Sequence, residues 1–222
     1  MKPPWHRAGW RAPKQTRITG KETGVCLVGF HPGYRDRVPW GDPAWELWGF
    51  NGLYRNVSVS YFTRWFELHA PGRGERLRGW REPQDELEAI AFKTVLYTVG
   101  GDSDVMGSAR YPLAEVARLA PHGAYHAGSF DYMVALALYL NASGQTHFTE
   151  LRVCGLSFIE PSGEPLSARP CLEYWLGIAE GRGLKVSVES GDLFRIFHLV
   201  RSDRQYGFDP FRLVVDEPRR KR

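Results

Sequence analysis

The sequence predicts an α/β protein: a single three-layer α/β/α domain over residues 24–215, built around a mostly parallel sheet. Two observations lead to this fold class. Short, continuously apolar runs such as Val25–Val28 recur along the chain, and such runs are typical of strands that are buried on both faces. Helical segments of about ten residues separate these runs, an alternation that places parallel strands between two layers of helices.

The N-terminal part of the domain supplies the first two predicted strands. Gly24–Val28 is expected to form the first strand. A loop rich in glycine and proline follows over Gly29–Pro43, and we expect a short helical turn within it. The second strand is expected across Glu46–Phe50, so that Asn51 lies at its carboxyl end.

The middle of the chain is expected to add two strands and one helix. The aromatic-rich run Tyr61–His69 predicts a third strand that ends in a polar pair. An irregular stretch rich in glycine and arginine, Pro71–Arg81, comes next. An early proline and several acidic residues then predict a helix over Glu82–Ala91, and Val95–Val99 predicts a further strand.

The C-terminal part is expected to alternate helices with strands. One helix is predicted from Tyr111 to Ala120, and a strongly apolar one over Phe130–Leu140 with Ser129 as its N-cap. The remaining predicted elements are a buried strand at Leu151–Cys154, a helix at Cys171–Arg182 that ends at Gly183, and a last parallel strand at Leu184–Val188.

Composition excludes several protein classes. A chain of 222 residues that is 43% hydrophobic can bury a full core. It contains no uninterrupted apolar run of the roughly 18 residues that a membrane helix needs, and its N-terminus lacks the apolar segment of a signal peptide. Cys26, Cys154 and Cys171 are widely spaced and suggest neither a disulfide framework nor a zinc site. We therefore expect a cytoplasmic protein without a membrane partner.

The two ends of the chain are basic. Residues 1–23 form a predicted arm that is rich in lysine, arginine, proline and glycine, and residues 216–222 form a basic tail. Segments of this composition are usually solvated, and in a minority of proteins they bind nucleic acid or another anion. Both alternatives stay open at this point.

Short motifs in the two halves of the domain resemble a known group of proteins. The matching residues are Gly29, Pro32 and Gly33 after the first strand, Asn51 after the second strand, Gly128, Ser129, Tyr132, Met133, Ala135 and Ala137 in the apolar helix, and Gly155 in the following strand. The combination is similar to Rossmann-like proteins that include small single-domain bacterial sialyltransferases and proteins similar to 6-hydroxymethylpterin diphosphokinase. Related uncharacterised bacteriophage proteins belong to the same group.

The resemblance covers residues 24–55 and 125–190, and within it the chain departs from the group's pattern at three motifs. His31 replaces the second glycine of the group's Gly-x-Gly-Pro-Ser loop, and Gly33 replaces its serine. The Thr-Ser pair at the helix start is shifted to Gly128-Ser129, and Ser157 stands where a strand-end aspartate is expected.

The resemblance implies a set of nucleotide-binding residues. In the sialyltransferase branch, the glycine loop and the asparagine hold a nucleotide donor, the helix start lies near it, and a histidine acts as general base without a metal. Gly29, Pro32, Gly33, Asn51, Gly128 and Ser129 would then line a nucleotide-sugar pocket. No histidine of this chain can be matched to that base by motif.

The residue types at these positions are also suited to binding a phosphate group and a nucleoside. The loop Gly29–Gly33 could present backbone N–H groups to a diphosphate, with His31 near its charge; the alternative is a tight turn without a ligand. Asn51 could bind a ribose or a base edge, or it could form a turn with Gly52.

Histidines supply the candidate general bases. Glu67 and His69 are two residues apart, so on a strand their side chains face the same way, and His69 is the first candidate to deprotonate an acceptor hydroxyl. The alternative for His69 is a structural role at the strand end. His126 lies in a predicted phosphate-side loop and is the second candidate; it could instead be solvated.

Two further patterns are candidates for ligand contacts. Arg169 and Glu173, near the start of the helix before the last strand, could bind the acceptor substrate. Asp102 and Asp104 have a spacing that can hold a divalent metal on a diphosphate, although the pattern is short. The tryptophans are expected to be mainly core residues, with stacking on sugars or unpaired bases as the alternative.

These observations lead to one main hypothesis and two alternatives. The main hypothesis is glycosyltransferase-like group transfer from a nucleotide-activated donor to a hydroxyl acceptor, with no cofactor beyond that donor. The acceptor could be nucleic acid bound through the basic termini, for example a modified base in phage DNA, in which case the protein would act in the host cytoplasm. The alternatives are a non-catalytic nucleotide-binding or accessory protein, and Mg²⁺-dependent pyrophosphate transfer that uses Asp102 and Asp104.

Overall fold

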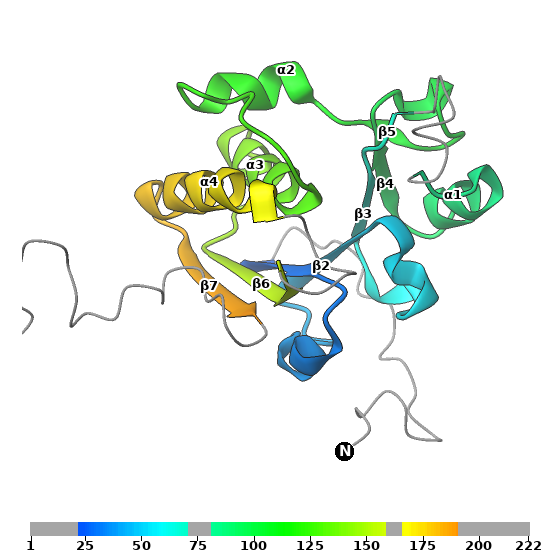
Figure 1. The fold of residues 1–222 in the computed structure, drawn as a ribbon, viewed down its shortest axis with the longest axis horizontal. Helices are drawn as coiled ribbons and strands as arrows, with labels where there is room; N and C mark the ends of the chain where they lie inside the picture. Colours follow the sequence, from blue (N-terminus) through cyan, green and yellow to red (C-terminus); the bar gives the residue numbers. More distant parts are fainter. Residues whose placement is uncertain (1–21, 71–80, 159–165, 191–222) are drawn as a thin grey trace, which may run out of the picture.

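The centre of the protein is a seven-stranded sheet in which every pairing within the described residues is parallel (Figure 1). The computed structural model describes residues 22–70, 81–158 and 166–190. The strand order is β5-β4-β3-β2-β1-β6-β7, so the predicted α/β class with a Rossmann-like sheet is confirmed.

The strands are β1 (Gly24–Val28), β2 (Trp45–Phe50), β3 (Arg64–Glu67), β4 (Val95–Thr98), β5 (Ala109–Arg110), β6 (Glu150–Leu156) and β7 (Lys185–Ser190). The helices are α1 (Gln84–Ala91), α2 (Leu113–Val116), α3 (Ser129–Ala142) and α4 (Arg169–Gly181). Short 3₁₀ turns connect them, among them Pro32–Arg37, which is the helical turn expected in the first loop, and Asn51–Arg55.

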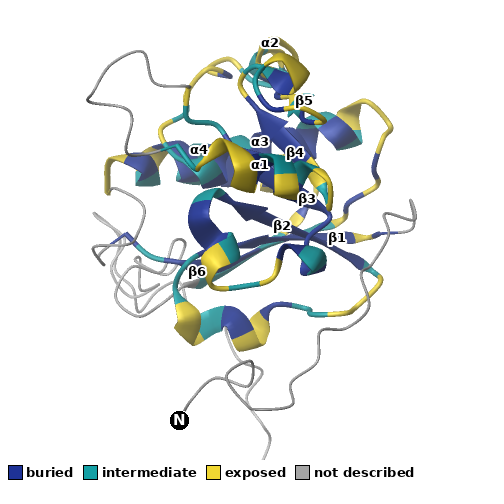
Figure 2. Ribbon diagram, turned by 90° about the vertical axis from the view of Figure 1, so that its right-hand side faces the viewer, coloured by how far each residue is buried: buried dark blue, intermediate teal, exposed yellow. Residues whose placement is uncertain are grey.

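Both faces of the central strands are buried, as their apolar sequence predicts. In β1, Val25 and Leu27 pack into the core beneath α3 and α4, whereas Cys26 and Val28 pack into the core that includes residues of α1. Figure 1 shows α3 and α4 side by side on one face of the sheet, and Figure 2 shows the strands as a mostly buried layer. The side chains of successive residues in β1 therefore supply two separate cores.

Several predicted elements differ from the structure. The third strand covers only Arg64–Glu67, because Val59–Tyr61 forms a 3₁₀ turn before it. Strand β5 was not predicted; its two residues are too few to leave a pattern. The predicted Tyr111–Ala120 helix consists of α2 followed by a 3₁₀ turn at Ala117–Leu119.

The predicted end of α4 is confirmed in detail. Gly183 has a φ of 89°, which a glycine adopts without strain. Its N–H donates to the carbonyl of Glu180 at 2.8 Å, and the N–H of Leu184 donates to that of Ala179 at 3.0 Å. This pair of bonds is the Schellman arrangement that ends many helices.

The tryptophans that the structure describes are mainly part of the core. Trp48 and Trp65 are fully buried, Trp45 is nearly so, and Trp40 packs edge-on against Tyr61. Trp80, the predicted basic tail and all but the last two residues of the predicted basic arm lie outside the described residues. No helix in the described ranges is both long and apolar enough to cross a membrane.

The strand order indicates at which end of the sheet a ligand would be expected to bind. From β1 the sheet grows in one direction through β2, β3, β4 and β5, and the chain then returns to place β6 and β7 on the other side of β1. The carboxyl ends of β1 and β6 therefore form a switch point, where open α/β sheets usually bind ligands.

Candidate functional site

At the switch point the loops that follow β1 and β6 are bonded directly to each other. The N–H of Gly29 donates to the carbonyl of Cys154 at 2.7 Å, and the N–H of His31 donates to the carbonyl of Gly155 at 2.9 Å. A Cβ at position 29 would overlap the carbonyl of Gly155, and Gly155 itself has a φ of 76°. Glycine is thus required here because two backbone segments touch.

These bonds occupy the backbone donors of the predicted phosphate loop. A third donor, the N–H of Gly33, is bonded at 3.1 Å to Nδ1 of His31, which caps the Pro32–Arg37 turn. Pro32 has no N–H group. Among the residues of Gly29–Gly33, three of the predicted phosphate donors are therefore bonded within the protein.

Asn51 connects the end of β2 to the start of α3. It has a φ of 46°, a left-handed conformation that asparagine tolerates better than most residues. Its side-chain Nδ2 donates to Oγ of Ser129 at 3.4 Å. Asn51 also opens the turn that contains Gly52, as one of its two expected roles requires; its other expected role, binding of a ribose or a base edge, stays a prediction.

The N-terminus of α3 lies at the same edge of the sheet. Ser129 is the first helical residue and Gly128 is the N-cap, so the prediction of Ser129 as N-cap is wrong by one position. The cause is Asp131, whose Oδ2 accepts the N–H groups of Ala127 and Gly128, each at 2.9 Å. Asp131 thus holds the two N–H groups that precede the helix, as the acidic residue of a capping box does.

A carboxylate and a histidine form a pair at the end of β3. Nδ1 of His69 lies 2.7 Å from Oε1 of Glu67, and the side chain of Glu67 is fully buried. The backbone N–H of His69 donates to the same oxygen at 3.1 Å. About a third of the His69 side chain, 34%, is exposed. The predicted common orientation of Glu67 and His69 is thus present, with a direct contact.

Two residues from beyond the 71–80 segment fix this pair. The backbone N–H of Glu82 donates to Oε2 of Glu67 at 3.3 Å, and Arg81 donates to the carbonyl of His69 at 3.0 Å. Arg81 also binds both carboxylate oxygens of Asp104, at 2.8 and 3.1 Å. The Glu67 carboxylate is therefore bonded both to His69 beside it and to Glu82, which is 15 residues further along the chain.

The two aspartates predicted for a metal have other partners. Both oxygens of Asp104 accept bonds from Arg81, and Oδ1 of Asp102 accepts the N–H of Gly107 at 2.7 Å. In the described part of the chain, no group of three or more histidine, cysteine, aspartate or glutamate residues is arranged to hold a metal ion.

His126, the second candidate base, is enclosed by the protein. Its side chain is 1% exposed and lies between the rings of Tyr132 and Trp175, whose centroids are 4.0 and 5.1 Å away and nearly parallel to it. Nδ1 faces Oδ1 of Asp131 and Nε2 faces the carbonyl of Gly123, both at 3.1 Å. In this arrangement the imidazole supports the loop before α3 and is not solvated.

The two candidate acceptor residues at the start of α4 bind each other. Nε of Arg169 lies 2.7 Å from Oε1 of Glu173, one helical turn further along the same helix. The N-terminus of α4 faces the carboxyl edge of the sheet because α4 follows β6. Arg169 and Glu173 are therefore at the predicted edge but form an ion pair with each other.

Sequence reasoning missed several residues that shape this edge. Asp131 could have been found, since an acidic residue three positions after Gly128 is a capping pattern. Arg81 and Glu82 left no local signal, because their partners Glu67 and Asp104 are distant in sequence.

We compared the chain with models of protein families, with curated proteins and with solved structures, and none of these comparisons found a match.

Proposed function

We propose that the protein is a group-transfer enzyme that moves a glycosyl group from a nucleotide-activated donor to an acceptor hydroxyl. The observation that carries the proposal is the buried Glu67 beside the partly exposed His69 at the carboxyl end of β3. A histidine held by a carboxylate in this way is suited to general-base catalysis.

The position of the pair in the sheet supports the proposal. Phe50 of β2 and Phe66 of β3 are paired in register, so Asn51, directly after β2, and Glu67, the last residue of β3, follow paired positions of adjacent strands. Neighbouring strands are about 4.8 Å apart. The polar contact between Asn51 and Ser129 and the Glu67–His69 pair therefore share one edge of the sheet.

Each group has a role in the proposed reaction. The proposed reaction uses the tautomer in which Nδ1 of His69 carries the proton shared with Glu67, so that the lone pair of Nε2 accepts the proton of the acceptor hydroxyl. The hydroxyl oxygen then forms a bond to the anomeric carbon of the donor, and the bond from that carbon to the phosphate oxygen breaks. The leaving phosphate takes the electron pair and is stabilised at the N-terminus of α3, near Ser129 and Asn51.

In this proposal the phosphate binds at the N-terminus of α3 and not at the glycine loop Gly29–Gly33. The N–H groups of Gly29, His31 and Gly33 already have acceptors within the protein. The first N–H groups of a helix have no intrahelical acceptor, so α3 offers donors that the loop does not.

Ligand binding is tested by thermal unfolding in the presence of nucleotides and nucleotide sugars. A ligand that binds the folded state raises the melting temperature, and we expect Asn51→Ala and Ser129→Ala to remove that rise. His147→Ala, which changes an exposed histidine, is the matched control and should keep the rise. Unchanged melting with every nucleotide would contradict the proposal.

Chemistry is tested separately, by product formation from the donor that gives the largest shift. We expect His69→Ala to reduce the rate about 10²- to 10⁴-fold, the usual contribution of a general base, and to keep the thermal shift. His147→Ala should react like the unchanged protein.

A second candidate function is nucleotide binding without catalysis. The occupied donors of Gly29, His31 and Gly33 favour it, because the loop has lost part of a phosphate-binding surface. This function predicts a thermal shift that Asn51→Ala removes, and no product from any donor. His69→Ala and the unchanged protein would then give the same thermal shift and the same absence of product.

A further inference from the structure

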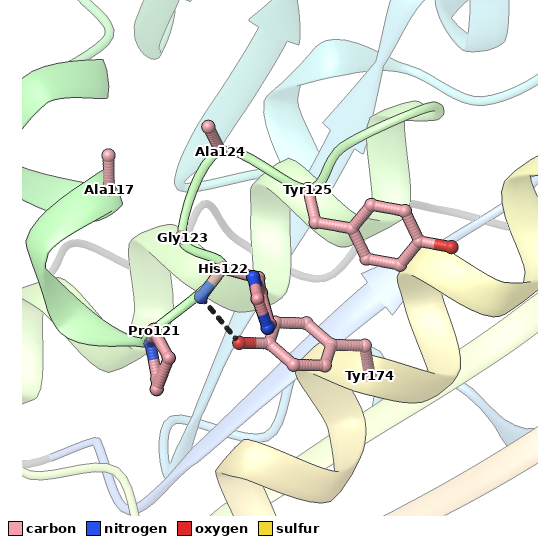
Figure 3. A pocket seen from close by; sticks show the side chains of 7 residues that line it. All are labelled: Ala117, Pro121, His122, Gly123, Ala124, Tyr125 and Tyr174. Atoms are coloured by element: carbon pink, nitrogen blue, oxygen red, sulfur yellow. Dashed lines mark hydrogen bonds between the residues drawn. The ribbon is translucent and has the colours of Figure 1, made fainter.

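A ring-lined hollow lies beside the loop that leads into α3, separate from the Glu67–His69 pair. Figure 3 shows this hollow, which has a volume of about 720 Å³. Pockets for small molecules are commonly about 300–1,000 Å³. It is lined by Ala117, Pro121, His122, Gly123, Ala124, Tyr125 and Tyr174.

The walls of the hollow are fixed by contacts with the core. The N–H of His122 donates to the hydroxyl of Tyr174 at 3.1 Å, which Figure 3 marks. The indole N–H of Trp175 donates to the carbonyl of Tyr125 at 3.0 Å. Gly123 lies so close to the backbone of Ala117 that a Cβ would overlap it. The hollow is therefore largely formed before any ligand arrives.

The buried His126 adds a further support beneath the same loop. Its imidazole bonds to the carbonyl of Gly123 at 3.1 Å and stacks on Trp175. Trp175 in turn packs edge-on against Tyr174, with ring centroids 5.7 Å apart. Gly123, a wall residue, is thus tied through His126 and Trp175 to α4.

Aromatic rings dominate the side chains that the hollow presents. The rings of Tyr125 and Tyr174 have centroids 5.8 Å apart and stand at 80° to each other. The ring of His122 lies 6.3 Å from that of Tyr174. Tyr125 is 46% exposed, so part of its surface is open to a ligand.

The lining selects the chemical class of the ligand. Among the described residues that line the hollow there is no carboxylate, lysine or arginine, so they offer a phosphate group no charged partner. Its polar side-chain atoms are limited to the His122 ring nitrogens and two phenol hydroxyls, one of which already accepts a bond from His122. A pyranose needs more partners for its hydroxyls, whereas a planar aromatic base is bound through its faces.

We propose that this hollow binds the base of a nucleoside by stacking on the ring of Tyr125, with Tyr174 as a side wall nearly perpendicular to that ring. The site is independent of the proposed transferase edge, since none of its lining residues belongs to the Asn51–Ser129 contact or the Glu67–His69 pair. The base can come from a free nucleoside or from an unpaired nucleic-acid strand.

The test is a calorimetric titration of the full-length protein with adenosine, with a short single-stranded oligodeoxyadenylate and with methyl glucoside. We expect adenosine or the oligonucleotide to bind and Tyr125→Ala to weaken that binding about 5- to 150-fold, the range found when a stacking aromatic residue is removed. Tyr125→Phe keeps the ring and should bind within about twofold of the unchanged protein.

Phe92→Ala is the matched control, because Phe92 is 93% exposed on the C-cap of α1 and does not line the hollow. It should bind like the unchanged protein. Circular dichroism and thermal unfolding check that each variant is folded; if Tyr125→Ala does not fold, Ala124→Trp, which places a bulky side chain in the hollow, takes its place with the same expected loss.

The outcomes distinguish this proposal from the proposed transferase. Binding by adenosine supports a free nucleoside as the source of the base, and binding by the oligonucleotide alone supports a strand, provided that Tyr125→Ala weakens it. If Asn51→Ala abolishes binding and Tyr125→Ala leaves it unchanged, the proposed base site in the hollow is wrong. That result would support the proposed nucleotide site near Asn51 and Ser129. Binding by methyl glucoside alone, or by none of the three probes, would also overturn the proposed base site in the hollow.

Discussion

Nδ1 of His69 lies 2.7 Å from Oε1 of Glu67, a carboxylate that is fully buried at the end of β3. Oε2 of the same carboxylate accepts the backbone N–H of Glu82 at 3.3 Å. Glu67 therefore joins the strand end to the residues before α1, and it orients the imidazole at the same time.

Replacing Glu67 by glutamine tests both of these roles. The backbone N–H groups of His69 and Glu82 each donate to one carboxylate oxygen of Glu67. In Glu67→Gln one of these oxygens becomes an NH₂ group, which cannot accept a hydrogen bond. We therefore expect a loss of about 1–3 kcal/mol in the free energy of unfolding. The imidazole should lose its preference for the Nδ1-protonated tautomer, which nitrogen NMR measures.

Glu86→Gln is the control for this change, because Glu86 is exposed on α1. Its unfolding free energy should stay within about 0.5 kcal/mol of the unchanged protein. An equally small effect of Glu67→Gln, with the tautomer preserved, would show that the carboxylate does not orient His69.

Two glycine-to-alanine substitutions should change stability in opposite directions. Gly29→Ala places a Cβ against the carbonyl of Gly155, so we expect it to destabilise the fold by at least about 1–3 kcal/mol. Gly177→Ala lies inside α4, where nothing is within 4 Å of the new Cβ, and should stabilise the fold by up to about 1 kcal/mol. Denaturant unfolding measures both; a neutral Gly29→Ala would show that the β1 and β6 loops can separate.

The buried ion pair between Glu46 of β2 and Arg64 of β3 should contribute to the stability of the fold. Oε2 of Glu46 accepts bonds from Nε of Arg64 and from the indole of Trp48, both at 2.8 Å, and Glu46 is fully buried. Glu46→Ala leaves the Arg64 guanidinium without its counter-ion, and we expect a loss of about 3–5 kcal/mol. The double variant Glu46→Leu with Arg64→Met should lose less than either single change, as a double-mutant cycle by denaturant unfolding can measure.

Tyr54 should make the fold sensitive to high pH. Burial, followed by its hydrogen bond to Glu82 at 2.8 Å, raises the pKa of Tyr54 from 10.0 to about 12. Because the folded pKa is the higher one, the stabilisation is complete below about pH 10 and is lost as the pH rises toward about 12. Tyr54→Phe should flatten that decline when unfolding is measured across this range, and an unchanged slope would contradict the assignment.

Local sequence patterns predicted most of the elements near the site. The apolar run Gly24–Val28 gave a strand with the predicted bounds, and Gly183 ended α4 where expected. The predicted contact between Glu67 and His69 is present, but β3 ends at Glu67, so the bend that holds His69 against the carboxylate was not given by the strand pattern. Strand β5 could not be predicted, because its only support is pairing with Tyr97 and Thr98 of β4.

The sequence by itself determined the fold class, because continuous apolar strands alternating with helices can bury both faces only in a parallel sheet between helical layers. Only the tertiary structure decided the chemistry of the switch point. Gly29 and His31 donate their N–H groups to Cys154 and Gly155, segments distant in the chain, so no local pattern could show that these donors are occupied. His126 is likewise enclosed by Asp131 and Trp175 from two different helices, because burial depends on which elements pack together.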